Sequence, residues 1–426
     1  MRGELHYDAV VIGAGTAGLT AGARLAEGGA RVCVVAKGVG STHLAPATID
    51  VLGYTPARVA SPAAALEELA ALRPDHPYAL LGGETVAESL RWFRAAVESG
   101  PSMPGYRYVG DLDRNHLLPT AVGALRPSAL VPETMAGGNM ATDASASVCI
   151  VGSRSLRDFH AGLCAANLGR AGIEARAVGI EIEVTRADEN TVGMARRFDD
   201  PAWRADFAAR LALKLGAEER IGMPAMLGAR DPHGAWADLE QRLGRAVFEI
   251  PTLPPSVPGM RLFEILRSAL RRAGGRLILG PEVVSYERSG SRIVSVAIAS
   301  AGHDAHYAAP WFVLASGGFG SGAIELDSRW ATHERVLGLP LRGLPDAGEP
   351  RFVGDYLAEQ PMARVGVAVD GELRAEGAEN VLVAGAGLPG AVPWREGSGE
   401  GIALASGSHA ARFVLAHSGA HAGAAA

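Results

Sequence analysis

The stretch Asp8-Ala-Val-Val-Ile-Gly13-Ala-Gly15-Thr-Ala-Gly18 decides the fold of this chain. Ala9–Ile12 is an apolar run typical of a buried parallel strand, and helix-forming residues follow the glycines. In such a turn Gly13 permits the tight bend, Gly15 lets a phosphate approach the backbone, and Gly18 lets the helix pack on the strand. The free N–H groups at the start of the helix then bind the phosphate. We therefore expect cofactor contacts from Gly13, Gly15, Thr16, Ala17 and Gly18.

The second expected strand, residues 31–36, ends without the acid that usually binds the adenosine ribose in a strand–helix–strand unit. Ala36 and Lys37 stand in its place, and both are expected near the cofactor. Three alternatives follow: the ribose is held in another way, the cofactor is FMN and has no adenosine, or Lys37 binds the extra phosphate of NADP. The rest of the chain disfavours NADP. We expect a flavin, with FMN favoured and FAD as the alternative.

Two further glycine-rich segments occur late in the chain. In residues 312–320 an apolar strand runs into small residues, and residues 380–387 repeat this pattern before residues 397–401 open a helix. A second helix start suits polar or negatively charged flavin atoms. A C-terminal glycine strand that rejoins an N-terminal fingerprint is the layout of two-segment flavoprotein domains. These segments add expected contacts from Ala315, Ser316, Gly317, Gly385, Gly387, Gly399, Glu400, Gly401 and Ile402.

The pattern between the glycine segments indicates a separate unit of alternating helices and strands. Residues 251–259 contain four prolines in nine residues, which excludes helix interior and central strand, and we interpret them as the return into the first domain. The predicted fold class is α/β: a Rossmann-like, two-segment flavin-binding domain of residues 1–60 plus 251–426, with an inserted α/β domain of residues 61–250. Residues 101–138 are rich in Pro and Gly, and we expect a loop near a site.

Composition and charge narrow the function classes. A net charge of −6 at pH 7 offers no global attraction to nucleic acid. The three cysteines, Cys33, Cys149 and Cys164, cannot ligate an iron–sulfur cluster and lack the spacing of a metal pair, so we expect reduced thiols and no metal site. No apolar run is long enough to span a membrane. We expect a cytoplasmic chain that reaches the inner face of the cell membrane only through a partner.

The three glycine motifs resemble those of the fumarate reductase and succinate dehydrogenase flavoprotein superfamily, whose members hold FAD. Within that superfamily, three strings are similar to the B-subunit family of anaerobic glycerol-3-phosphate dehydrogenase. They are residues 253–262 (Leu-Pro-Pro-Ser-Val-Pro-Gly-Met-Arg-Leu), 76–78 (His-Pro-Tyr) and 315–317 (Ala-Ser-Gly). The resemblance extends along most of the chain and is weakest between about residues 101 and 139.

The resemblance implies an FMN-containing subunit that pairs with an A-subunit, which is a flavoprotein, and with a membrane-associated iron–sulfur C-subunit. The implied reaction is oxidation of sn-glycerol 3-phosphate to dihydroxyacetone phosphate, with electrons passed to quinone. This chain would either oxidise the substrate or relay electrons from the A-subunit. The alternative is a stand-alone FAD-dependent, fumarate reductase-like enzyme that acts on a small carboxylate or ketone.

The sequence identifies the catalytic residues less clearly than the cofactor-binding residues. Oxidation of a secondary alcohol is easiest when a base takes the hydroxyl proton, and a phosphate-bearing substrate favours Arg or Lys. The catalytic candidates are His43, Arg351 and Arg395, with Arg364 and Glu400 also near the glycine motifs in sequence. His43 follows the second strand, where the chain passes the flavin. It is expected to contact the flavin, to bind it covalently, or to be an ordinary loop histidine.

Overall fold

A five-stranded parallel sheet forms the centre of the computed structural model, which describes residues 5–141, 147–182, 190–216, 220–299, 304–346 and 348–418. Its strand order is β12 (Arg276–Leu279), β3 (Val32–Ala36), β2 (Ala9–Ile12), β16 (Trp311–Leu314) and β21 (Val381–Val383). Strands from the start of the chain therefore lie between strands from its second half. This arrangement confirms the predicted two-segment α/β fold.

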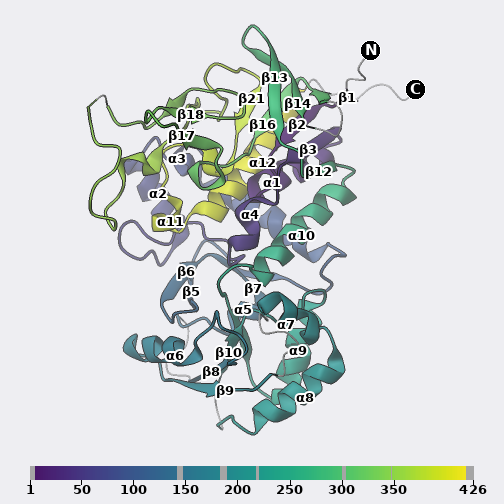
Figure 1. The fold of residues 1–426 in the computed structure, drawn as a ribbon, viewed down its shortest axis with the longest axis vertical. Coiled ribbons are helices and arrows are strands. Elements are labelled where there is room, and N and C mark those ends of the chain that lie inside the picture. Colours follow the sequence, from purple (N-terminus) through teal and green to yellow (C-terminus); the bar gives the residue numbers. More distant parts are fainter. Residues whose placement is uncertain are drawn as a thin grey trace.

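Three helices pack around this sheet: α1 (Thr16–Glu27), α10 (Val257–Arg272) and α12 (Gly399–His417). Glycines let α1 and α12 approach closely, since a Cβ on Gly407 would lie 2.4 Å from the carbonyl oxygen of Ala17. A second sheet covers one end, in the order β1 (Leu5–His6), β15 (Ala305–Ala308), β14 (Arg292–Ile298) and β13 (Val283–Ser289). Figure 1 shows these elements in the upper part of the molecule.

A separate hydrophobic core surrounds a second parallel sheet in the lower part of Figure 1. Its strand order is β11 (Val247–Ile250), β10 (Arg220–Pro224), β8 (Val148–Gly152) and β9 (Ala175–Gly179). The helices of this unit are α6 (Ala161–Arg170), α7 (Thr191–Phe198), α8 (Pro201–Ala212) and α9 (Pro232–Leu243).

The boundaries of the inserted domain stay a prediction. Helices α2 (Pro62–Leu72) and α4 (Gly83–Glu98) lie within residues 61–250, yet they contribute Leu66 and Phe93 to the first hydrophobic core. The short helix α3 (Pro77–Leu81) lies between them in sequence.

Residues 101–138 are not the loop that their composition indicated, and this expectation was wrong. They form the antiparallel pairs β4 (Tyr108–Gly110) with β7 (Leu130–Pro132) and β5 (His116–Pro119) with β6 (Leu125–Ser128), followed by α5 (Glu133–Ala136). Strands of three or four residues are too short to show an alternating pattern in sequence, because only their pairing across a turn defines them.

The remaining short strands and one further short helix come after β16 in the sequence. They are β17 (Ile324–Leu326) with β18 (Thr332–Glu334), β19 (Leu341–Arg342) with β20 (Gly366–Val367), and α11 (Pro393–Glu396). Within the described ranges, none of the helices combines the length and apolar character needed to cross a membrane.

A buried ion pair joins the two cores. Arg261 of α10 donates from Nη1 and Nη2 to the carboxylate of Glu249 in β11, at 2.6 and 3.0 Å, and both side chains are almost fully buried. Its Nε and Nη2 also donate to the carbonyl of Gly228. The Glu249 carboxylate accepts further bonds from Leu227 N and Thr134 Oγ1, each at 2.7 Å. These hydrogen bonds offset the cost of removing both charges from water.

Replacing Arg261 by methionine should lower the free energy of unfolding by about 3–5 kcal/mol, because the Glu249 carboxylate would stay buried without its counter-ion. Urea denaturation measures this loss. The matched control is Arg91→Met, which removes an exposed ion pair with Glu84 and should cost less than about 1 kcal/mol. Similar losses for the two variants would contradict the prediction.

Candidate functional site

The three glycine segments meet at the carboxyl edge of the parallel sheet. Leu314 of β16 lies opposite Ile12 of β2 on one side and Val383 of β21 on the other. The next residues stay paired: Ala315 N donates to Ile12 O at 2.8 Å, and Ala384 N donates to Leu314 O at 2.9 Å. Adjacent parallel strands end at the same edge, so the turns that follow them form one surface.

The first turn combines two packed glycines with one open glycine. Gly13 has a φ of +116°, and a Cβ there would lie 2.1 Å from the carbonyl oxygen of Ala315. A Cβ on Gly18 would lie 1.9 Å from the oxygen of Gly13. On Gly15, by contrast, it would meet no atom within 4 Å. Gly15 caps α1 without a side-chain hydrogen bond, and the first turn contains no acid. Free N–H donors beside open space fit the phosphate of a flavin.

The third glycine segment packs directly on the first two. Gly385 has a φ of +75°, and a Cβ there would lie 2.9 Å from the Cβ of Ala17. A Cβ on Gly387 would lie 3.2 Å from the carbonyl oxygen of Gly317. Gly385 N also donates to Ser406 Oγ at 2.9 Å, which ties this turn to α12. The structure therefore brings residues of all three predicted segments together. Thr16 and Ser316 lie half-buried in the same turns.

A carboxylate that sequence reasoning missed lies beside the end of β3, although it belongs to a distant part of the chain. Ala36 is buried, whereas Lys37 is exposed and forms an ion pair with Glu282 at 2.9 Å. The hydrogen bond from Lys37 lowers the pKa of Glu282. Glu282 lies far along the chain, just before β13, so only the pairing of β12 with β3 places an acid at this strand end.

His43 lies in a 3-10 turn, Gly40–Leu44, that packs on the first glycine turn. A Cβ on Gly40 would lie 3.1 Å from the Cα of Gly15. The imidazole ring packs edge-on against Phe263 at 5.1 Å, and among the described residues Nε2 is buried without a hydrogen-bond partner. Burial lowers the pKa of His43, which favours the neutral ring. Contact of His43 with a flavin stays a prediction.

A buried carboxylate that sequence reasoning also missed lies beside the start of α12. Asp50 accepts hydrogen bonds from Thr48 Oγ1 at 2.8 Å, from Ser128 Oγ and from Arg126 Nη2. Its backbone oxygen accepts a bond from Gly401 N at 3.0 Å. Strand β6, in the segment expected to be a loop near a site, is thus tied to the second helix start.

Glu400 occupies the first turn of α12 and is half-buried. Burial and the neighbouring charge of Asp50 raise the pKa of Glu400 to about 7, although Arg126 opposes the shift. The next residue must be small, because a Cβ on Gly401 would lie 2.3 Å from the hydroxyl of Tyr78. Gly399 is half-buried and Ile402 is buried in the same turn.

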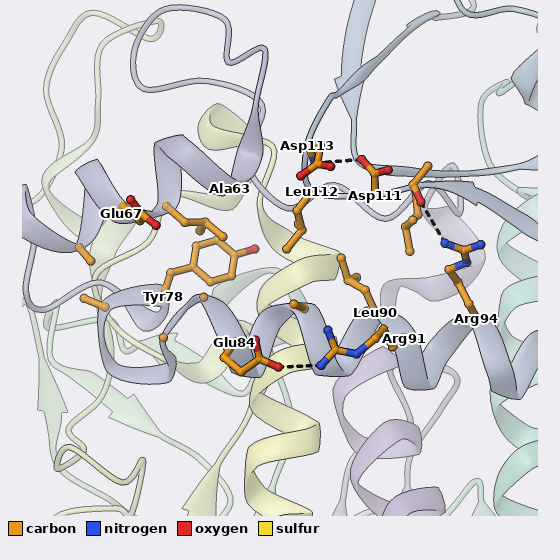
Figure 2. Close-up of a pocket in the computed structure, with 18 residues that line it drawn as sticks. Ala63, Glu67, Tyr78, Glu84, Leu90, Arg91, Arg94, Asp111, Leu112 and Asp113 are labelled. Atoms are coloured by element: carbon orange, nitrogen blue, oxygen red, sulfur yellow. Dashed lines mark hydrogen bonds and ion pairs between the residues drawn. The ribbon is translucent and has the colours of Figure 1, made fainter.

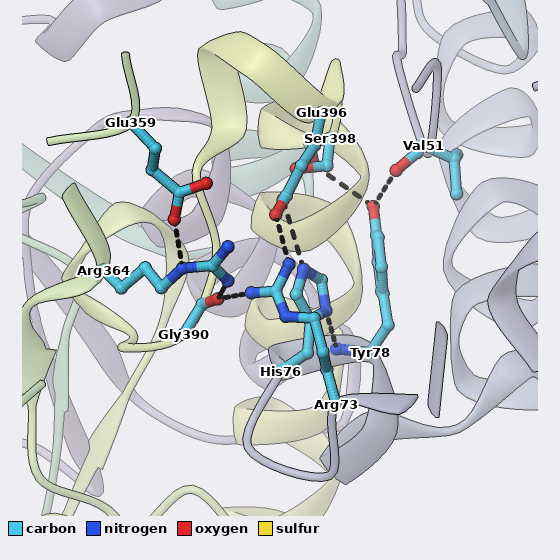
Figure 3. Close-up of polar contacts among 9 residues, drawn as sticks. All are labelled: Val51, Arg73, His76, Tyr78, Glu359, Arg364, Gly390, Glu396 and Ser398. Atoms are coloured by element: carbon cyan, nitrogen blue, oxygen red, sulfur yellow. Dashed lines mark hydrogen bonds and ion pairs between the residues drawn. The ribbon is translucent and has the colours of Figure 1, made fainter. Parts of the chain in front are cut away.

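A network of buried polar side chains lies next to the start of α12 and hydrogen-bonds to its N-cap residue, Ser398 (Figure 3). Glu396 Oε2 accepts hydrogen bonds from His76 Nε2 at 3.2 Å and Ser398 Oγ at 3.0 Å, while Oε1 pairs with Arg73 Nη1 at 2.8 Å. His76 Nδ1 accepts from Tyr78 N at 3.1 Å, so its proton is on Nε2 and faces Glu396. Tyr78 then donates its hydroxyl to the carbonyl of Ser398, the N-cap of α12, at 3.1 Å.

This network keeps a buried negative charge in place. Burial alone would raise the pKa of Glu396, but the hydrogen bonds from His76 and Arg73 outweigh it and lower the pKa to about 2. In sequence, residues 76–78 were noted only for a family resemblance. The partners Glu396 and Arg73 were missed, because more than three hundred positions separate them in the chain.

The structure does not bring the predicted arginines together with His43. Arg351 donates to Thr332 Oγ1 at 3.4 Å, and Arg395 is exposed and donates to the carbonyl of Leu357 at 3.1 Å. Within the described part of the chain, neither forms a hydrogen bond or ion pair with His43 or the glycine turns. Arg364 instead pairs with Glu359 and donates to the carbonyl of Gly390. Their catalytic roles stay predictions.

Gly15→Ala should weaken flavin binding by about tenfold or more, a loss of roughly 1.4 kcal/mol, because the methyl group would enter the space beside the free N–H donors. Stability of the flavin-free chain should change by less than about 0.5 kcal/mol, since no protein atom opposes the added carbon. Gly13→Ala is the contrast, and its clash with Ala315 should cost about 2 kcal/mol in the flavin-free chain. Flavin fluorescence titration and urea denaturation measure the two effects. Equal stability losses would argue against an open site at Gly15.

Glu396→Gln should lower the free energy of unfolding by about 2–3 kcal/mol at pH 7, because the buried charge that binds Arg73 is lost. The pKa of Glu396 in the folded chain is about 2, below its ordinary 4.5, so its stabilising effect is complete above 4.5 and disappears as the pH falls towards 2. Wild type and variant should therefore converge in urea denaturation between about pH 4.5 and 2. The control, Glu287→Gln, changes an exposed residue of β13 and should show no such convergence. A difference that stays constant with pH would refute the assignment.

Comparison with known proteins assigns the chain to a family. The family model described as FAD binding domain matches residues 8–388. The anaerobic glycerol-3-phosphate dehydrogenase B-subunit of Pectobacterium carotovorum subsp. carotovorum (strain PC1) is 33% identical over 425 residues, which cover 96% of this chain and 99% of that protein. The probable B-subunit of the same enzyme from Halobacterium salinarum (strain ATCC 29341 / DSM 671 / R1) is 31% identical over 423 residues, covering 95% and 96%.

Solved structures match the chain more distantly. The 3-ketosteroid delta1-dehydrogenase of Sterolibacterium denitrificans is 14% identical, with a TM-score of 0.46 and coverage of 96% of this chain and 99% of that chain. A flavocytochrome c3 fumarate reductase is 10% identical, with a TM-score of 0.45 and coverage of 98% and 79%. The family assignment therefore depends on the sequence matches: this chain is a flavin-binding protein of the FAD binding domain family and belongs, within it, to the B-subunit family of anaerobic glycerol-3-phosphate dehydrogenase.

Proposed function

We propose that this chain is a flavoprotein subunit of a glycerol-3-phosphate dehydrogenase, which oxidises sn-glycerol 3-phosphate to dihydroxyacetone phosphate. The observation that carries the proposal is the match to B-subunit relatives along nearly the whole of both chains. The open glycine turn at the start of α1 supports the flavin part of it. A flavin of the complex would accept the hydride that leaves the alcohol carbon.

The chain's own residues would hold the flavin at two helix starts. Backbone N–H groups at Gly15 and Thr16 would bind a phosphate, and the start of α12 at Gly399 and Glu400 would face the polar end of the ring. The 3-10 turn that carries His43 packs on Gly15 and would lie close to the same phosphate. These contacts account for the convergence of segments so distant in sequence.

We propose FAD as the flavin. The match to a FAD binding domain model does not support the expected preference for FMN. The expectation of FMN came from the missing acid after β3 and from the family resemblance, and the first of these grounds is weakened because Glu282 supplies a carboxylate beside Lys37 at that strand end. A ribose would be bound there by an acid from outside β3.

The chain is proposed to relay electrons from a substrate-oxidising A-subunit to a membrane-associated iron–sulfur C-subunit, which passes them to quinone. Arg73 and Arg126 lie beside the start of α12, but each is already paired with a buried carboxylate and is poorly placed to bind a substrate phosphate. The three cysteines are buried and too few to ligate an iron–sulfur cluster, so a cluster would come from another subunit. Such a complex would hold this chain at the inner face of the membrane.

Denaturation of the purified protein should release FAD, identified by chromatography. The chain combined with the A- and C-subunits of the same organism should reduce a dye acceptor with sn-glycerol 3-phosphate, whereas the chain alone should not. Release of FMN would overturn only the choice of flavin. Turnover of a small carboxylate or ketone by the isolated chain would instead support the stand-alone enzyme, and a chain without flavin would overturn the proposal.

A further inference from the structure

A sizeable cavity lies away from the glycine turns. It has a volume of about 630 Å³ and is formed by α2, α3, α4 and residues 110–113 (Figure 2). We call it the α2–α4 groove. None of the residues that line it belongs to the three glycine segments. The proposed flavin site therefore does not account for it.

The floor of the α2–α4 groove is apolar. Leu66, Leu90 and Leu130 are buried there and pack in the first core, and the ring of Tyr78 forms part of the wall. Small residues leave the space above this floor open: Ala63, Ala70, Ala79 and Ala87 all line it. An apolar side chain placed here would bury its surface against leucine side chains without displacing any part of the fold.

The rim of the groove carries excess negative charge. Four carboxylates and two guanidinium groups line it: Glu67, Glu84, Asp111, Asp113, Arg91 and Arg94. Glu84 and Arg91 neutralise each other in an ion pair at 2.7 Å. Three carboxylates and one guanidinium remain. Within the described ranges, the carboxylates of Glu67 and Asp113 have no hydrogen-bond or ion-pair partner.

The apolar floor and the acidic rim together indicate the chemistry of a partner that would fit the groove. Glu67, Gly82, Gly83 and Glu84 are exposed, so the groove opens to the surface and is bounded by helices, as in grooves that receive a helix. We propose that it receives, from another subunit of the same complex, an apolar side chain on a surface helix that is flanked by Lys or Arg. The inference rests on the proposed function, because it requires that the chain be one subunit of several.

The groove lies directly behind the start of α12. The Tyr78 ring lines the groove, while its hydroxyl donates to the carbonyls of Val51 at 2.6 Å and Ser398 at 3.1 Å. A partner side chain in the groove would therefore contact the residue that holds the N-cap of α12. The Tyr78 side chain would therefore lie between the partner subunit in the groove and the helix start that is proposed to face the flavin.

Charge reversal and groove filling test the docking. The chain is co-expressed with the A- and C-subunits of the same organism, and the dissociation constant of the complex is measured by mass photometry. Glu67→Lys with Asp113→Lys should weaken the complex by about tenfold or more, because like charges would then face each other. Ala87→Trp should weaken it similarly by occupying the groove. Binding of the wild type should fall with rising salt.

The matched control is Asp158→Lys with Glu174→Lys, which makes the same charge change on exposed residues outside the groove and should leave the complex intact. Circular dichroism melting verifies that each variant is folded, and the double reversal serves alone if Ala87→Trp unfolds. Normal assembly of folded groove variants would overturn the docking proposal and leave the function standing. A wild-type chain that carries flavin but joins neither of the other two subunits would overturn the proposed function instead.

Discussion

Strand β16 is hydrogen-bonded to β2 on one side and to β21 on the other, and the rest of the molecule depends on this pairing. It places the carboxyl ends of three strands at one edge, although they come from the start, the second half and the last part of the chain. The turns that follow can then pack backbone against backbone. That packing tolerates only glycine, because a methyl group at position 13 or 18 would overlap a carbonyl oxygen.

The turns pack closely on one another, yet the start of α1 stays open. Gly13 and Gly18 hold the turn against its neighbours, whereas Gly15 faces space. One short motif thus contains glycines with different physical roles: two are required by the packing, and one faces the space proposed for the phosphate. The same division occurs at the second helix start, where Gly401 packs on Tyr78 while Glu400 remains only half-buried.

Buried charges surround this second helix start on two sides. Asp50 is held by Arg126, Ser128 and Thr48, and Glu396 is held by Arg73, His76 and Ser398. Buried carboxylates are costly unless every oxygen is paired, so these networks fix the geometry of the segments that contribute to them. The Arg261–Glu249 pair does the same between the two cores. The α2–α4 groove then gives the outer face of this region a surface with unpaired acids.

The sequence by itself determined the α/β class, the two-segment domain and the three glycine turns. These features depend on local properties: apolar runs form buried strands, and glycine is required where backbone approaches backbone. The family was also readable, because short strings such as residues 253–262 are specific. Only the tertiary structure decided which charged residues face one another. Glu282 meets Lys37, Arg126 meets Asp50, and Glu396 meets His76 across gaps that no periodicity spans. The same limit explains the hairpins within residues 101–138, since strands of three or four residues are defined by their partners and not by their own pattern.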